Sequence, residues 1–174
     1  MGIAANQARL MTLTARQNDL EYKAQQISAI KMRLSQTTST LAQNYATALN
    51  NYSALNAAQH MVDSNSTGSF IFDTATGSYS VAPEGYTGTV VPAAELVQKV
   101  ADYLNAGTVS TANGYLTLEQ GKYTTETERI SAQEKIYDME LTQVNTEHDA
   151  IKTEYDAIKS LVGDNVEKSF NVFG

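Results

Sequence analysis

An apolar residue recurs at every seventh position through the first third of the chain. The series is Leu13, Leu20, Ile27, Leu34, Leu41, Ala48 and Leu55. A second series with the same period lies near the other end: Ile130, Tyr137, Val144, Ile151 and Ile158, flanked by Leu141, Tyr155 and Val162. A strict seven-residue repeat keeps one apolar stripe of a helix turned toward a partner helix. We therefore expect two long helices that pair.

Helix-favouring residues without an intervening Gly or Pro run from residue 3 to residue 60, which predicts one continuous helix. A second helix is expected from about residue 122 to residue 172. Beyond Val162 the apolar spacing changes to Val166, Phe170 and Phe173, which is closer to an ordinary helical period, so any supercoil should relax there.

The segment between the two helices is rich in Gly, Ser, Thr and Tyr. Residues 70–81 predict a β-hairpin, because two apolar runs flank the turn sequence of residues 73–77. A further extended segment is expected at residues 86–91 and another at residues 115–118. Pro92 should start a short amphipathic helix that ends near Leu104. These elements predict a small α+β insert.

The expected fold is mainly α: a long antiparallel two-helix coiled-coil hairpin with this insert at its turn. The predicted divisions are residues 1–62 for the N-terminal heptad helix, 63–118 for the insert and 119–174 for the C-terminal heptad helix. In that arrangement Arg16 should approach Glu167, and Arg33 should approach Asp149.

Charge argues against some partners. The 174-residue chain has a net charge of −7, which disfavours nucleic acid because binding phosphates requires a basic face. No run of about 20 apolar residues predicts a membrane span, and the polar opening turns do not resemble a cleavable signal peptide. Residues 1–62 carry +3 and residues 119–174 carry −6, so the two helices should attract one another.

No charged residue lies between Arg33 and Asp63, although a solvated helix normally carries Lys and Glu. One interpretation is a helix of low charge in a soluble protein. The other is a face that packs against further copies, since uncharged side chains avoid the cost of burying charge. The residues predicted to mediate self-association are Leu13, Leu20, Ile27, Leu34, Leu41, Tyr45, Tyr52, Leu55, Val144, Ile151, Tyr155, Ile158 and Val162.

The residue types of catalysis are sparse. His60 and His148 are the two histidines, and neither lies in a zinc-binding spacing. His148 falls on the apolar repeat of the second helix, where a hydrogen-bonded structural histidine is expected. The chain has no cysteine and no phosphate-binding glycine loop or nucleophile elbow. The sequence predicts a non-enzyme without a cofactor or metal.

Two terminal heptad helices around a β-containing insert resemble flagellin-like and type III secretion filament subunits in architecture. The opening MGIAANQARLMTLTARQNDLEYKAQQIS is similar to the start of a group of uncharacterised coiled-coil proteins from gut bacteria. A self-assembling filament or sheath subunit, at the cell surface or outside the cell, is predicted from the two heptad series, the uncharged stretch between Arg33 and Asp63, and the insert rich in Tyr, Gly and Ser. It would bind copies of itself, with the insert facing outward toward a possible partner protein. The alternative is an intracellular, cytoplasmic coiled-coil adaptor or chaperone-like protein.

Overall fold

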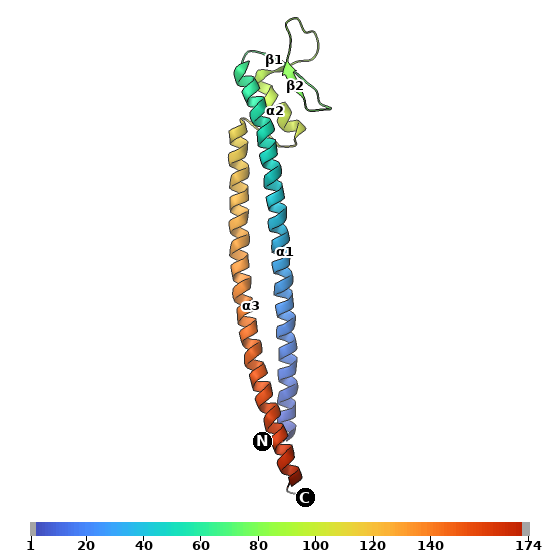
Figure 1. The fold of residues 1–174 in the computed structure, drawn as a ribbon, viewed down its shortest axis with the longest axis vertical. Coiled ribbons are helices and arrows are strands. Elements are labelled where there is room, and N and C mark those ends of the chain that lie inside the picture. The colour runs from blue at the N-terminus through green and yellow to red at the C-terminus, as the bar shows by residue number, and fades with distance from the viewer. Residues whose placement is uncertain (1–2, 172–174) are drawn as a thin grey trace. The chain divides into compact units, whose positions relative to one another are not determined.

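A computed structural model describes the backbone of residues 3–171 and the side chains of residues 4–168. Phe173 and the side chain of Phe170 lie outside the described residues. The elements are helix α1 (Ile3–Ser64), strands β1 (Ser69–Phe72), β2 (Tyr79–Val81) and β3 (Val91–Pro92), and helices α2 (Ala93–Tyr103) and α3 (Ala112–Asn171) (Figure 1). The predictions of a mainly α chain, two long helices and a small intervening sheet are confirmed.

The contacts divide the chain into two compact units. Unit 1 consists of Met1–Gln36 and Ile130–Gly174, and unit 2 consists of Thr37–Arg129. In each unit a segment of α1 packs against a segment of α3. Supercoiling of the two helices stays a prediction.

In unit 1 the two helices run antiparallel. Glu21 lies near His148, and Lys31 forms an ion pair with Asp138. Between these two contacts α1 advances ten residues while α3 goes back ten. The predicted direction is therefore confirmed.

The expected register is wrong. Arg9 pairs with Glu154, so Arg16, which lies further along α1, faces residues that precede Glu154 in α3. At about 1.5 Å of rise per residue, Glu167 then lies roughly 20 Å or more further along the helix. By the same reasoning, Arg33 follows Lys31 and lies level with residues near Asp138, far from Asp149.

Unit 2 contains the predicted hairpin. Strands β1 and β2 pair antiparallel, with Phe72 opposite Tyr79, and β3 pairs with the other edge of β1. The turn is closed by hydrogen bonds from the amide of Asp73 to the carbonyl of Ser78 and from the amide of Gly77 to the carbonyl of Asp73. Gly77 has a φ of 70°, a left-handed conformation that glycine adopts without steric cost.

The core of unit 2 joins the insert to α1. Phe70 of β1, Leu96 of α2 and Leu55 of α1 are fully buried in one cluster. Tyr115 belongs to the same cluster and lies in α3. The predicted extended segment at residues 115–118 is therefore wrong, because α3 already begins at Ala112.

Candidate functional site

The apolar series of both helices meet in unit 1. The cluster of buried side chains comprises Leu13, Leu20, Ile27, Val144, Ile151 and Ile158, with Leu10, Ala24, Tyr137, Leu141, Tyr155 and Val162 packed against it. We call this cluster the seam. It is one side chain deep on each helix, since most residues of the seven-residue series are buried, whereas Tyr137 and the flanking apolar side chains three or four positions away are half-buried.

The same periodicity continues into unit 2. Ala48 and Leu55 are buried, and Leu41 is half-buried. The ring of Tyr45 stacks on that of Tyr123, with centroids 4.5 Å apart and planes inclined by 22°. Aromatic pairs of this kind contribute stability beyond the area that they bury.

The hydroxyl of Tyr52 donates a hydrogen bond to the side chain of Asn113 at 3.2 Å. Tyr52 therefore marks the level on α1 at which α3 starts, because Asn113 is the second residue of that helix. The remaining turns of α1, from Leu55 onward, are free to pack against the insert.

The structure thus brings most of the predicted self-association residues into contacts within one chain. The seam of unit 1 contains eight of them, and the cluster of unit 2 contains Leu55 and Tyr52. Tyr45 lies in the stacked pair, whereas Leu34 and Leu41 are half-buried. Their role in contacts between chains stays a prediction.

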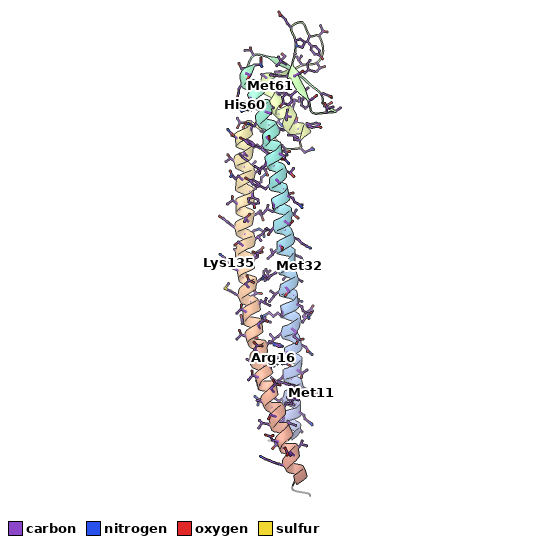
Figure 2. All side chains as sticks on the ribbon, in the orientation of Figure 1. Met11, Arg16, Met32, His60, Met61 and Lys135 are labelled. Atoms are coloured by element: carbon purple, nitrogen blue, oxygen red, sulfur yellow. The ribbon has the colours of Figure 1, made fainter. Side chains whose placement is uncertain are left out.

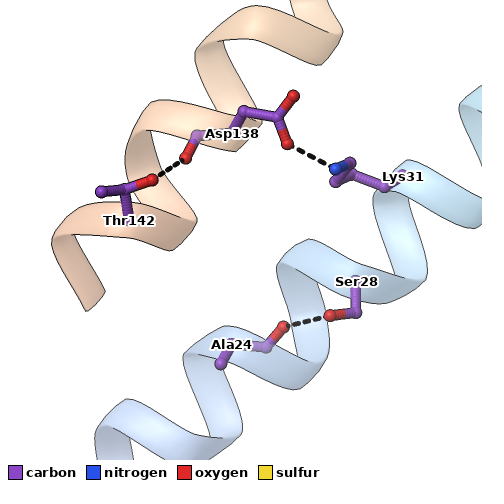
Figure 3. A network of polar contacts seen from close by, with 5 residues as sticks. All are labelled: Ala24, Ser28, Lys31, Asp138 and Thr142. Atoms are coloured by element: carbon purple, nitrogen blue, oxygen red, sulfur yellow. Dashed lines mark hydrogen bonds and ion pairs between the residues drawn. The ribbon is translucent and has the colours of Figure 1, made fainter. Parts of the chain in front are cut away.

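Ion pairs lie along the edges of the seam. Arg9 binds Glu154 through Nε at 2.9 Å and through its terminal nitrogen. Lys31 pairs with Asp138, whose backbone carbonyl accepts a hydrogen bond from Thr142 (Figure 3). These side chains are partly exposed, and such pairs are each worth less than about 1 kcal/mol. They select the register of the helices more than they stabilise them.

His148 lies on the edge of the seam in contact with acids. Its Nε2 is 3.5 Å from Glu21, and its Nδ1 is 3.6 Å from Asp149. Glu21 comes from the opposite helix, so His148 bridges α1 and α3 within unit 1. A hydrogen-bonded structural role for His148 stays a prediction.

A second stripe of α1 lies on the side away from the seam. It consists of Ala8, Met11, Ala15, Asn18, Tyr22, Gln25, Ala29 and Met32, and we call it the α1 outer face. None of these residues is charged. Met11 is 75% exposed, Tyr22 63% and Met32 62% (Figure 2 labels the two methionines). The outer positions of a paired helix are usually its most polar ones.

Helix α3 has a corresponding stripe in unit 1. It consists of Ala132, Ile136, Met139, Gln143, Thr146, Ala150, Thr153, Ala157 and Ser160, all exposed, and we call it the α3 outer face. It is also without charge. Met139 is 65% exposed and lines a shallow groove of about 480 Å³ that is bordered by Asp138 and Glu147.

Sequence reasoning missed these two outer faces. The signal was present, because Met11 and Met32 are three heptads apart and the stripe between them avoids all seven charged residues of the first 36. The apolar seam is the stronger of the two periodic signals, and it masks the weaker one when only large apolar residues are counted.

The uncharged part of α1 continues through unit 2. Ala42, Ala46 and Ala57 are exposed there, and Leu49 is 42% exposed. On α3, Leu118 is 57% exposed beside Gly121 and lines a groove of about 520 Å³. Exposed apolar side chains thus lie on the long helices of both units, and Lys122 and Glu126 also line the groove beside Leu118.

Within the described part of the chain, no group of three or more His, Asp or Glu side chains is placed to hold a metal ion. No helix among residues 3–171 is long and apolar enough to cross a membrane. The sequence matches no family model and no curated protein, and no solved structure matches the chain.

Proposed function

We propose that this protein is a non-enzymatic, self-assembling structural subunit of a filament or sheath. The observation that carries the proposal is the exposure of large apolar side chains on both helices of unit 1, on the sides that the seam leaves uncovered. Uncharged stripes that carry large apolar side chains are suited to packing against further helices, because no charge has to be buried in the contact. The architectural likeness to flagellin-like and type III secretion filament subunits supports the same role.

Unit 1 has a thin core. Its seam is formed by two helices alone, so each helix buries one stripe and leaves most of its residues exposed. Packing of further helices would bury Met11, Met32 and Met139 and would gain about 1.5–3 kcal/mol for each such side chain that becomes fully buried. No charge on the outer faces would have to be desolvated.

Sedimentation velocity over a wide concentration range, combined with electron microscopy, tests this function. We expect the mean mass to rise with concentration and elongated assemblies to appear. A monomer that persists at high concentration would contradict the proposal. Leu20→Asp serves as a control, because a carboxylate in the seam should unpair the helices and abolish ordered assembly.

The proposed location is the cell surface or the medium, without cleavage of a signal peptide. Fractionation of the native host with an antibody against the chain would test this. Retention in the cytoplasm would instead favour the second candidate function described next.

An adaptor or chaperone-like role is the second candidate. The insert favours it through exposed apolar side chains on unit 2, among them Val81, Tyr86, Val90 and Tyr103. Such a surface suits a partner protein that uses aromatic and aliphatic contacts. Discrete dimers or tetramers with a concentration-dependent melting temperature would support this role over the filament.

A further inference from the structure

We propose that copies of this chain associate through a heterologous lateral contact between their unit 1 segments. The α1 outer face of one copy packs on the α3 outer face of the next. This inference rests on the proposed function and specifies its interface. The partner is a second copy of the same chain.

Both faces are suited to helix packing. Each carries two or three large apolar side chains among smaller residues: Met11, Tyr22 and Met32 on α1, and Ile136 and Met139 on α3. Small residues allow close approach of two helices, and the large side chains form ridges that fit the grooves of a neighbouring helix. A groove of about 440 Å³ lies beside Met11.

The net charges of the two helices determine which face meets which. Residues 3–36 of α1 carry five basic and two acidic side chains, a net charge of +3. Residues 130–171 of α3 carry four basic and nine acidic ones, a net charge of −5. Contact of α1 with α1, or of α3 with α3, would place like charges side by side, whereas contact of α1 with α3 places opposite charges together.

The proposed interface would continue a contact that already exists inside the chain. The seam already pairs α1 with α3, and the proposed interface repeats this pairing on the opposite side of each helix. Every α1 would then lie between two α3 helices, one from its own chain and one from a neighbour. A contact between two different faces leaves one free face at each end, so the assembly continues as an open series.

The test uses two double variants at exposed positions. Met11→Glu with Met32→Glu introduces two carboxylates on the α1 outer face, and Ile136→Glu with Met139→Glu introduces two on the α3 outer face. Glutamate is a good helix former, so circular dichroism should show unchanged helix content. We expect each variant alone to associate at least about tenfold more weakly than the unaltered chain.

Mixing the two variants distinguishes contact between two different faces from contact between two identical faces. Each variant keeps the face that the other has lost, so an equimolar mixture should form dimers of one copy of each and grow no further. Thr12→Glu with Gln26→Glu is the matched control. It adds the same charge to exposed positions of α1 outside the α1 outer face, and it should assemble like the unaltered chain.

Three results would overturn the inference while leaving the proposed function intact. Both variants could assemble like the unaltered chain, the variant of the α3 outer face could form dimers by itself, or the mixture could remain monomeric although the unaltered chain assembles. An unaltered chain that stays monomeric would instead overturn the proposed function together with this interface.

Discussion

Any other residue at position 77 would be strained, both by the backbone conformation of Gly77 and by the ring that lies beside it. Its φ is 70°, and an added Cβ would lie 2.4 Å from Cε1 of Tyr103. A non-glycine residue in the left-handed region costs about 1–2 kcal/mol, and the contact with the Tyr103 ring adds to this. We therefore expect Gly77→Ala to lower the free energy of unfolding of unit 2 by about 2–4 kcal/mol, measured by urea denaturation.

Gly85 provides the control for Gly77. Its φ is 82°, but nothing lies within 4 Å of the position that a Cβ would take. Gly85→Ala should therefore show the backbone cost alone. Equal losses in the two variants would show that Tyr103 moves aside without cost.

Asp73 makes the same turn sensitive to pH. The hydroxyl of Thr76 donates a hydrogen bond to its carboxylate at 2.5 Å, and the amide of Ala75 donates another at 2.9 Å. Both bonds lower the pKa of Asp73 below its ordinary value, and the bond from the Thr76 hydroxyl has the largest effect. The carboxylate therefore stabilises the turn at pH values above the ordinary carboxyl range, and this contribution is lost as the pH falls through the lowered pKa.

Removal of the Thr76 hydroxyl should change the pKa of Asp73. In Thr76→Val the pKa of Asp73 is expected to rise toward its ordinary value, as followed by the carboxyl signal in an NMR titration. Thr74→Val changes a neighbouring residue of the same turn and should leave the pKa where it is. An identical pKa in the Thr76 variant would assign the shift to the backbone amides of Ala75 and Thr76.

At the scale of single elements, local patterns predicted most of the structure. The heptads identified both long helices, and the turn sequence between Phe72 and Tyr79 identified the hairpin. The segment Tyr115 to Leu118 follows Gly114 and contains Tyr and Thr, which are residues that favour strands. It is helical because α3 continues the packing on α1, where Tyr115 becomes buried, and such tertiary contacts override local propensity.

The register could not be predicted from the heptads, since a seven-residue repeat matches itself after every shift of seven. We expected α3 to start opposite the end of α1. It starts opposite Tyr52 instead, because the last three turns of α1 hold the core of the insert through Leu55 and Ala58. The outer faces were missed for a different reason: their residues are mostly small, and the signal is an absence of charge.

A disulfide provides a direct test of the observed register. Ala24 and Val144 line one hollow of the seam together with Leu20 and His148. In this cysteine-free chain, Ala24→Cys with Val144→Cys should oxidise within one chain, because a disulfide requires Cα atoms within about 7 Å. Cysteines at positions 17 and 166, which suit the register expected from the sequence, should remain reduced. Gel mobility and mass spectrometry would identify each product.

At the scale of the whole molecule, the described residues form two hydrophobic cores. The cluster around Phe70 in unit 2 and the seam of unit 1 have no residue in common. Helices α1 and α3 supply residues to both cores, so the two units are linked by backbone. Local stability can differ between such units, because each is held by its own buried contacts.

Hydrogen exchange can therefore separate the two cores. Leu20→Asp places a carboxylate at a seam position that is 8% exposed, at a cost of several kcal/mol. We expect faster amide exchange in residues 3–36 and 130–168, with protection retained in β1 and α2. Phe70→Ala removes a fully buried ring, costs about 3–5 kcal/mol, and should show the reverse pattern. If each variant accelerated exchange equally in both units, the chain would unfold as one cooperative structure, and the division into two cores would have no thermodynamic meaning.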